Sequence, residues 1–176
     1  GDLPSGVGGY GDFIYAKDLL EYVKSLYGNQ FHLEVGAYPE VHPQAKSADD
    51  DFIHFSNKVK AGADGAITQF FFSPEAYYEF MDRSEKANLG IPITPGLITI
   101  TNKESLLRMA CSCGAKVPKK IIKDLDKLND EGVTKYGIDV LTKLADDLLS
   151  FGAPGIHFYT INKLEPTKAI VESLKL

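Results

Sequence analysis

Short apolar segments alternate with segments of helical periodicity along the 176 residues of the chain. In the helical segments an apolar residue recurs every three or four positions, and Gly, Pro or Ser residues mark their ends. The short segments are apolar throughout or alternate with polar residues, as strands do. The pattern therefore predicts strands at about 31–37, 65–72, 93–98 and 155–159, with helices at about 13–27, 48–61, 74–90, 101–110, 118 onward, 133–150 and from 166.

Strands separated by helices favour a parallel sheet that helices cover. Two architectures fit this order, a doubly wound sheet and part of a (β/α)8 TIM barrel. A complete barrel takes about 250 residues. Four strand–helix units in a single domain of residues 1–176 therefore amount to about half of a (β/α)8 barrel, or to a small open sheet.

Composition and charge exclude several classes of partner. The chain is 44% hydrophobic and 24% charged, which is typical of a globular domain. The net charge of −5 and the absence of a basic run longer than Lys119–Lys120 argue against nucleic acid. No apolar run approaches the roughly 20 residues that a membrane helix needs, so we expect no membrane partner.

The two cysteines and the first residues bear on the compartment and on the start of the chain. Cys111 and Cys113 form a C-x-C pair, which is a poor metal site and an awkward disulfide. We expect free thiols, no metal and a cytoplasmic protein.

The chain opens on Gly1 without an initiator Met, and we expect that this start is cut rather than natural.

The segment after the first predicted strand is the first candidate site. Pro39 and Pro43 stop both strand and helix, so a stiff loop presents Tyr38, Glu40 and His42. An aromatic, an acid and an imidazole on one loop after a buried strand are typical of a ligand site in an α/β protein. A loop with a packed Tyr and a hydrogen-bonded His is the alternative, and the residues alone leave both open.

Gln69 is the second candidate, because it interrupts an otherwise apolar strand. A buried amide without a partner costs about 1–3 kcal/mol, so Gln69 should have one. Its partner is either a backbone group of a neighbouring loop or a ligand with donor and acceptor edges, such as a pterin or flavin ring.

Five segments, taken together and in order, resemble the methylenetetrahydrofolate reductase family. They are Gly1–Pro4, Ala37–Pro43, Ala66–Phe72, Pro95–Leu97 and His157–Asn162. The resemblance implies a (β/α)8 barrel that uses FAD, with NADH or NADPH as electron donor. Such an enzyme reduces methylenetetrahydrofolate to methyltetrahydrofolate in one-carbon metabolism and methionine biosynthesis. The resemblance also implies that the intact enzyme is a homo-oligomer. It further implies that the family's first strands, which carry a catalytic glutamate, are missing before Gly1.

The resemblance further implies roles for single residues. Asp2, beside the flavin and the pterin, and Gln69, facing folate and nicotinamide, are the candidate catalytic residues. The residues that correspond to FAD contacts are Asp2, Tyr15, Ala16, Tyr38, His42, Asp51, His54, Asn57 and Lys58. Those that correspond to folate contacts are Asp2, Gln69, Tyr159 and Lys163.

Several positions depart from the family pattern. Lys163 replaces an expected Arg, which removes a bidentate grip on a carboxylate. His54 and Asn57 stand where Asn and Arg are expected. Ser105 and Met109 stand where some bacterial members have Gln and Phe, so the choice between NADH and NADPH stays open.

Two other functional hypotheses stay open at this point. One is a non-catalytic half-barrel that supplies a binding or structural surface to a partner chain. The other is a pterin-handling barrel without flavin. Glu34 and Glu40 are the acids nearest the candidate site, and we assign neither as the proton donor.

Overall fold

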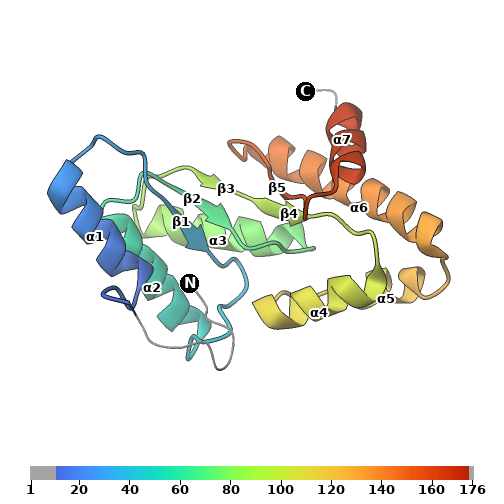
Figure 1. Cartoon of the computed structure of the whole chain (residues 1–176), viewed down its shortest axis with the longest axis horizontal. Coiled ribbons are helices and arrows are strands. Elements are labelled where there is room, and N and C mark those ends of the chain that lie inside the picture. Colours follow the sequence, from blue (N-terminus) through green and yellow to red (C-terminus); the bar gives the residue numbers. More distant parts are fainter. Residues whose placement is uncertain (1–10, 175–176) are drawn as a thin grey trace.

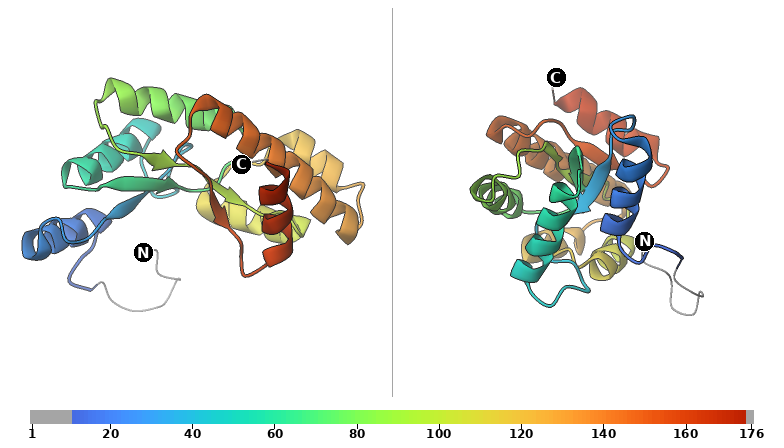
Figure 2. Two further views of the ribbon diagram at one scale, coloured as in Figure 1. Left: turned by 90° about the horizontal axis from the view of Figure 1, so that it is seen from above. Right: turned by 90° about the vertical axis from the view of Figure 1, so that its left-hand side faces the viewer.

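Seven helices and five short strands make up the part of the chain that the computed structural model describes, residues 11–174 (Figure 1). Asp2 lies outside the described residues. The strands run through the middle of the molecule, with α1 and α2 at one end and α4 to α7 at the other (Figures 1 and 2). The elements are α1 Ala16–Tyr27, β1 Glu34–Ala37, α2 Ala48–Lys60, β2 Gly65–Thr68, α3 Pro74–Lys86, β3 Ile93–Thr94, β4 Gly96–Ile98, α4 Lys103–Cys113, α5 Lys119–Leu125, α6 Asp130–Phe151, β5 His157–Tyr159 and α7 Leu164–Ser173.

All paired strands are parallel, as the alternation of strands and helices predicted. One sheet has the order β1-β2-β3 and the other pairs β4 with β5. The predicted strand 93–98 is therefore wrong as one element, because Pro95 divides it. Pro95 has no N–H to donate, and its carbonyl accepts the His157 N–H at 2.9 Å, so pairing passes from β2 to β5 at this residue.

The predicted strand 65–72 ends early, at Thr68. The Gln69 N–H still donates to the Ala37 carbonyl at 2.7 Å, but the Phe70 N–H donates to the Gln69 side-chain oxygen at 3.0 Å. Residues 70–72 are all buried, as their apolar character predicted. The burial of residues 70–72 was therefore predicted correctly. The strand stops at Thr68 because the Gln69 side chain, and not a neighbouring strand, accepts the Phe70 N–H.

The two sheets are joined where Thr68, Gly96 and Tyr159 meet. The Gly96 N–H donates to the Thr68 hydroxyl at 2.9 Å, and the Tyr159 hydroxyl donates to the Thr68 carbonyl, also at 2.9 Å. A Cβ atom on Gly96 would lie 2.3 Å from the Thr68 carbonyl oxygen and 2.7 Å from the Tyr159 ring. Only glycine lets these three residues approach so closely.

The core lies between the strands and the helices that cover them. In α6 the buried residues recur at helical spacing, from Val133 through Leu141 to Leu148. In α3 the buried Tyr77 hydroxyl donates to the Ile93 carbonyl at 2.7 Å, and burial raises the pKa of Tyr77 to about 12, so it stays a donor. Each large apolar side chain buried here contributes about 1.5–3 kcal/mol.

Some helix ends lie where the sequence predicted them, and others do not. The Ser47 side chain caps α2 by accepting the Asp50 N–H at 3.1 Å, and Gly28 ends α1 with a positive φ of 56°, as predicted. The predicted start of α4 at Thr101 is wrong, because Asn102 is the capping residue, accepting the Ser105 N–H at 2.9 Å. The helix also continues to Cys113, beyond its predicted end.

Most of the apolar residues of α1 are exposed. The helix forms where it was predicted, but Leu20 is its one buried residue. The exposed large hydrophobic residues of this region are Phe13, Ile14, Tyr15, Leu19, Tyr22, Leu26, Tyr27 and Phe31. Helical periodicity thus identified the helix correctly but not a surface on which it packs.

Gly96→Ala should destabilise the fold by about 3 kcal/mol, because backbone and ring atoms have no room for a methyl group. Gly155→Ala is the matched control, since an added Cβ there meets nothing within 4 Å. Urea unfolding of both variants measures the difference. Equal free energies of unfolding for Gly96→Ala and the parent would show that a methyl group fits between Thr68 and Tyr159, which would contradict the described contact.

Candidate functional site

The loop that follows β1 is held in one conformation by its own hydrogen bonds. The His42 N–H donates to the Asp51 carboxylate at 2.9 Å, and the His42 ring Nδ1 accepts the Gln44 N–H at 3.0 Å. The rings of Tyr38 and His42 lie edge to face, with centroids 4.5 Å apart. An Nδ1 that accepts a hydrogen bond is unprotonated, so the neutral imidazole carries its proton on Nε2.

Lys58 brings a cation to the same place from α2. Its ammonium group donates to the carbonyl of Gly36 in β1. Burial lowers the pKa of Lys58, and the charge of Asp51, two turns earlier on the helix, raises it in part. Gly36 has nothing within 4 Å of where a Cβ would lie, so the space beside this strand is open. An anionic group placed here would favour the charged form of Lys58.

Gln69 lies beside Tyr38. Both residues line a small crevice whose other wall is formed by Cys113 and Gly114 at the end of α4. The Gln69 side-chain oxygen accepts a backbone N–H, that of Phe70, so a backbone partner is present. The partner lies in the same loop rather than in a neighbouring one.

The remaining predicted site residues lie apart from this cluster or on its rim. Tyr15 precedes α1 and is 69% exposed, and its N–H donates to the Asp18 carboxylate at 3.1 Å. Ala16 begins α1. His54 is exposed on α2, 3.6 Å from Asp50, and Asn57 is half-buried on the same helix.

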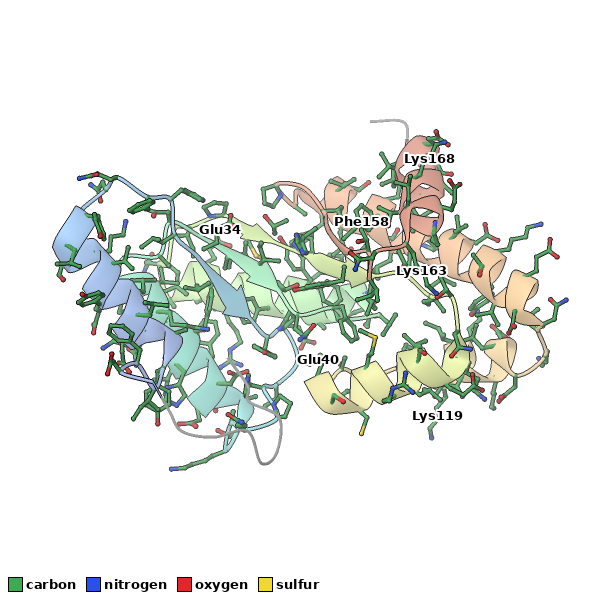
Figure 3. All side chains as sticks on the ribbon, in the orientation of Figure 1. Glu34, Glu40, Lys119, Phe158, Lys163 and Lys168 are labelled. Carbon is green, nitrogen blue, oxygen red and sulfur yellow. The ribbon has the colours of Figure 1, made fainter. Side chains whose placement is uncertain are left out.

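Tyr159 ends β5 and contacts the residue that precedes Gln69, and Lys163 lies just before α7. The Tyr159 hydroxyl is engaged at the joint with Thr68, and the Lys163 ammonium group donates to the Thr101 hydroxyl at 2.9 Å. Lys163 is exposed, and Figure 3 shows it between α7 and α4. The structure therefore brings together Tyr38, His42, Asp51, Lys58 and Gln69, while Asp2 lies outside the described residues.

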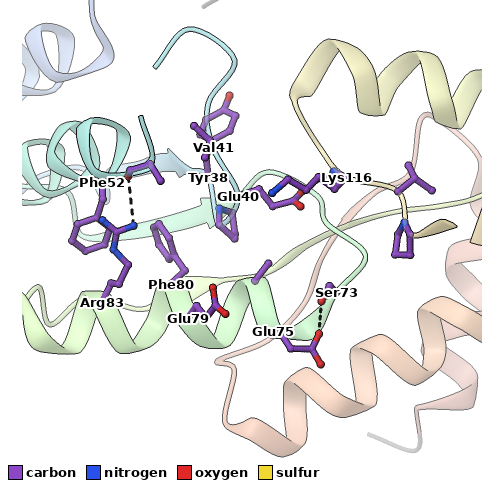
Figure 4. A pocket seen from close by; sticks show the side chains of 15 residues that line it. Tyr38, Glu40, Val41, Phe52, Ser73, Glu75, Glu79, Phe80, Arg83 and Lys116 are labelled. Carbon is purple, nitrogen blue, oxygen red and sulfur yellow. Dashed lines mark hydrogen bonds between the residues drawn. The ribbon is translucent and has the colours of Figure 1, made fainter. Parts of the chain in front are cut away.

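A cavity of about 460 Å³ opens on the other side of the 38–43 loop (Figure 4). Side chains from the loop, α2, α3 and residues 116–118 line it. The Glu40 carboxylate at its edge accepts the Lys116 N–H at 2.8 Å, and burial raises the pKa of Glu40 against the opposing effect of that bond. Sequence reasoning missed this cavity, because segments far apart in the chain form it. The one available signal was Glu40 itself, between Pro39 and His42.

Metal-binding clusters and membrane-spanning helices are both absent from residues 11–174. No group of three His, Cys, Asp or Glu side chains there is arranged to hold a metal ion. None of the helices in this range combines the length and the apolar character that crossing a membrane requires.

Comparison with known proteins identifies the family. The family model described as methylenetetrahydrofolate reductase matches residues 1–175. The chain belongs to the methylenetetrahydrofolate reductase family. This confirms the resemblance that the five sequence segments indicated, and it places the Tyr38–Pro43 loop and Gln69 within a family of known enzymes.

Individual members of the reductase family are similar over nearly the whole chain. It is 37% identical to 5,10-methylenetetrahydrofolate reductase of Escherichia coli over 176 residues, which cover 99% of this chain and 58% of that protein. It is 33% identical to methylenetetrahydrofolate reductase (NADH) 1 of Arabidopsis thaliana, covering 100% of this chain and 32% of that protein. The chain thus spans little more than half the length of its bacterial relatives.

A solved structure supports the fold. A protein from Clostridium thermocellum, described as binding two copies of 5-methyl-5,6,7,8-tetrahydrofolic acid, superposes with a TM-score of 0.66 at 21% identity. The match covers 91% of this chain and 57% of that protein. At this identity the likeness shows a shared α/β fold.

Asp51→Asn should lower the pKa of Lys58 further, because it removes the one charge that opposes the effect of burial. The amide keeps an oxygen that can accept the His42 N–H. Asp49→Asn is the matched control, since Asp49 lies on the same helix but pairs with Arg83 at 2.8 Å. NMR titration of the Lys58 side chain measures the pKa. An unchanged value in Asp51→Asn would contradict the described electrostatics.

Proposed function

We propose that this chain forms the cofactor- and folate-binding part of a methylenetetrahydrofolate reductase that uses FAD. The observation that carries the proposal is the cluster of Tyr38, His42, Asp51, Lys58 and Gln69 in a chain of this family. When bound, the flavin supplies the hydride that reduces the folate methylene group. The residues of this chain bind and orient the reactants.

The cluster fits the chemistry of FAD. The cofactor carries a pyrophosphate, and Lys58 is a partly desolvated cation with open space beside the neighbouring Gly36. A phosphate oxygen would compensate the burial of the ammonium group better than one carbonyl does. Tyr38 and His42 offer an aromatic face and an imidazole N–H on a loop whose shape is already set.

Gln69 is proposed to orient the pterin and the nicotinamide. Its side chain stands at the crevice beside Tyr38, so a ring bound there meets an amide with donor and acceptor groups. Asp2 is proposed to act on the flavin and the pterin. The ligand described for the Clostridium thermocellum protein, a methyltetrahydrofolate, is the product that this reaction would form.

We further propose that the chain is about half of a (β/α)8 barrel and acts within a complete one. β1 is an edge strand, with one side unpaired among the described residues. Next to it, α1 and its flanks expose eight large hydrophobic side chains between Phe13 and Phe31. The rest of a barrel would pair that edge and cover that face. A cytoplasmic homo-oligomer using NADH or NADPH belongs to the same proposal.

Replacing His42 and Lys58 together by Ala in the complete barrel should weaken FAD binding by about hundredfold, since two charge-assisted contacts are lost. His32→Ala with Lys60→Ala is the control, because it removes the same residue types from exposed positions. Flavin fluorescence titration measures the affinity. Full FAD affinity in the His42/Lys58 variant would overturn the assignment of this cluster.

The 176-residue chain alone should associate with itself through the exposed α1 face and should show no folate reductase activity. The remaining barrel half, added as a second chain or a longer polypeptide, should abolish the association and restore turnover. Sedimentation velocity and a methylenetetrahydrofolate reduction assay follow the two properties. Turnover by the monomeric chain near that of an intact enzyme would contradict the half-barrel proposal.

A further inference from the structure

The segment that follows α4 contacts the 38–43 loop at several points. The Glu40 carboxylate accepts the Lys116 N–H at 2.8 Å, a hydrogen bond between residues 76 positions apart. Figure 4 shows the two residues side by side at the edge of the cavity. Figure 3 places Glu40 between the end of β1 and the end of α4.

Gly114 makes a second contact from the same segment. It ends α4 with a positive φ of 72°, which favours glycine. An added Cβ would lie 3.0 Å from the Val41 carbonyl oxygen and 3.2 Å from the Pro43 ring. The turn after α4 therefore packs against the 38–43 loop. Two residues later, the Lys116 N–H donates to the Glu40 carboxylate and adds a further contact between the same segments.

These contacts form one wall of the crevice at Gln69. Cys113, Gly114 and Ala115 line it on one side, and Tyr38 and Pro39 line it on the other. If the segment after α4 moved away from the loop, this crevice would widen and would lose the wall that Cys113, Gly114 and Ala115 form. The distances between the residues that line the crevice thus depend on a tie between two distant segments, the hydrogen bond from the Lys116 N–H to Glu40.

We propose that Glu40 is a positioning residue that holds Tyr38 and His42 beside Gln69 by tying their loop to the end of α4. The proposal rests on the proposed flavin and folate site, whose spacing it explains. What the tie requires is an acceptor oxygen at the length of a glutamate side chain, since the donor is a backbone N–H.

The charge of Glu40 has two opposing effects. Burial raises the pKa of Glu40, whereas the Lys116 N–H and the Lys116 charge lower it in part, so the ionised form regains from Lys116 part of what it loses by burial. Other charged groups line the same cavity, namely Glu75, Glu79, Arg83 and Lys116. A neutral side chain of the same length should therefore replace Glu40, whereas a shorter acid should not.

Three variants separate length from charge. Glu40→Gln keeps the length and an acceptor oxygen and loses the charge. Glu40→Asp keeps the charge and is one methylene too short, and Glu40→Ala loses both. Glu79→Ala is the control, because Glu79 lines the same cavity but is exposed on α3.

Hydrogen exchange on the 176-residue chain tests the tie itself. The Lys116 amide should exchange about tenfold faster in Glu40→Asp and Glu40→Ala, and at the parent rate in Glu40→Gln and Glu79→Ala. If the Ala variant does not fold, the Gln and Asp variants still decide the outcome. Equal exchange of Lys116 in the Gln and Asp variants would overturn the proposal.

FAD affinity in the complete barrel tests the positioning role. Glu40→Asp and Glu40→Ala should bind FAD about tenfold more weakly, with Glu40→Gln within about twofold of the parent. A parent that binds FAD, together with an Asp variant that binds it equally well, would contradict only the role of Glu40. A parent protein without FAD affinity would contradict the proposed function.

Discussion

The contact among Thr68, Gly96 and Tyr159 supports the rest of the structure. Through it the pairing of β1, β2 and β3 continues into β4 and β5, although Pro95 interrupts the ladder. The Tyr159 hydroxyl binds the carbonyl of Thr68, and the next residue along the chain is Gln69. The peptide between Thr68 and Gln69 is therefore held by a residue of the second sheet. A change at Gly96 in this joint would therefore reach Gln69 through the backbone of Thr68.

Electrostatics in the loop region follow from partial burial of two opposite charges. Lys58 and Glu40 both lie where their ionised forms are disfavoured, and each meets a backbone group that offsets the cost in part. The two differ in what they offer a ligand. The Lys58 ammonium group binds the carbonyl of Gly36, a residue with open space beside it, and suits an anion. The Glu40 carboxylate is instead bonded to the segment after α4.

Sequence reasoning predicted the parallel α/β arrangement and the alternation of strands and helices along the chain, because both follow from local periodicity. It also selected Tyr38, His42 and Gln69 as candidate site residues, and the structure places them near one another at the ends of parallel strands. It missed the division at Pro95, because which strand pairs with which is decided by contacts between distant segments. The exposure of α1 and the bond from Glu40 to Lys116 were missed for the same reason.

The most direct test of the account is the visible absorption of the complete barrel that contains these residues, followed through one cycle of the reaction without oxygen. The account predicts flavin absorption in the purified protein, its loss on addition of NADH or NADPH, and its return on addition of methylenetetrahydrofolate. A correctly folded complete barrel that carries no flavin, or whose reduced flavin does not respond to the folate, would contradict it.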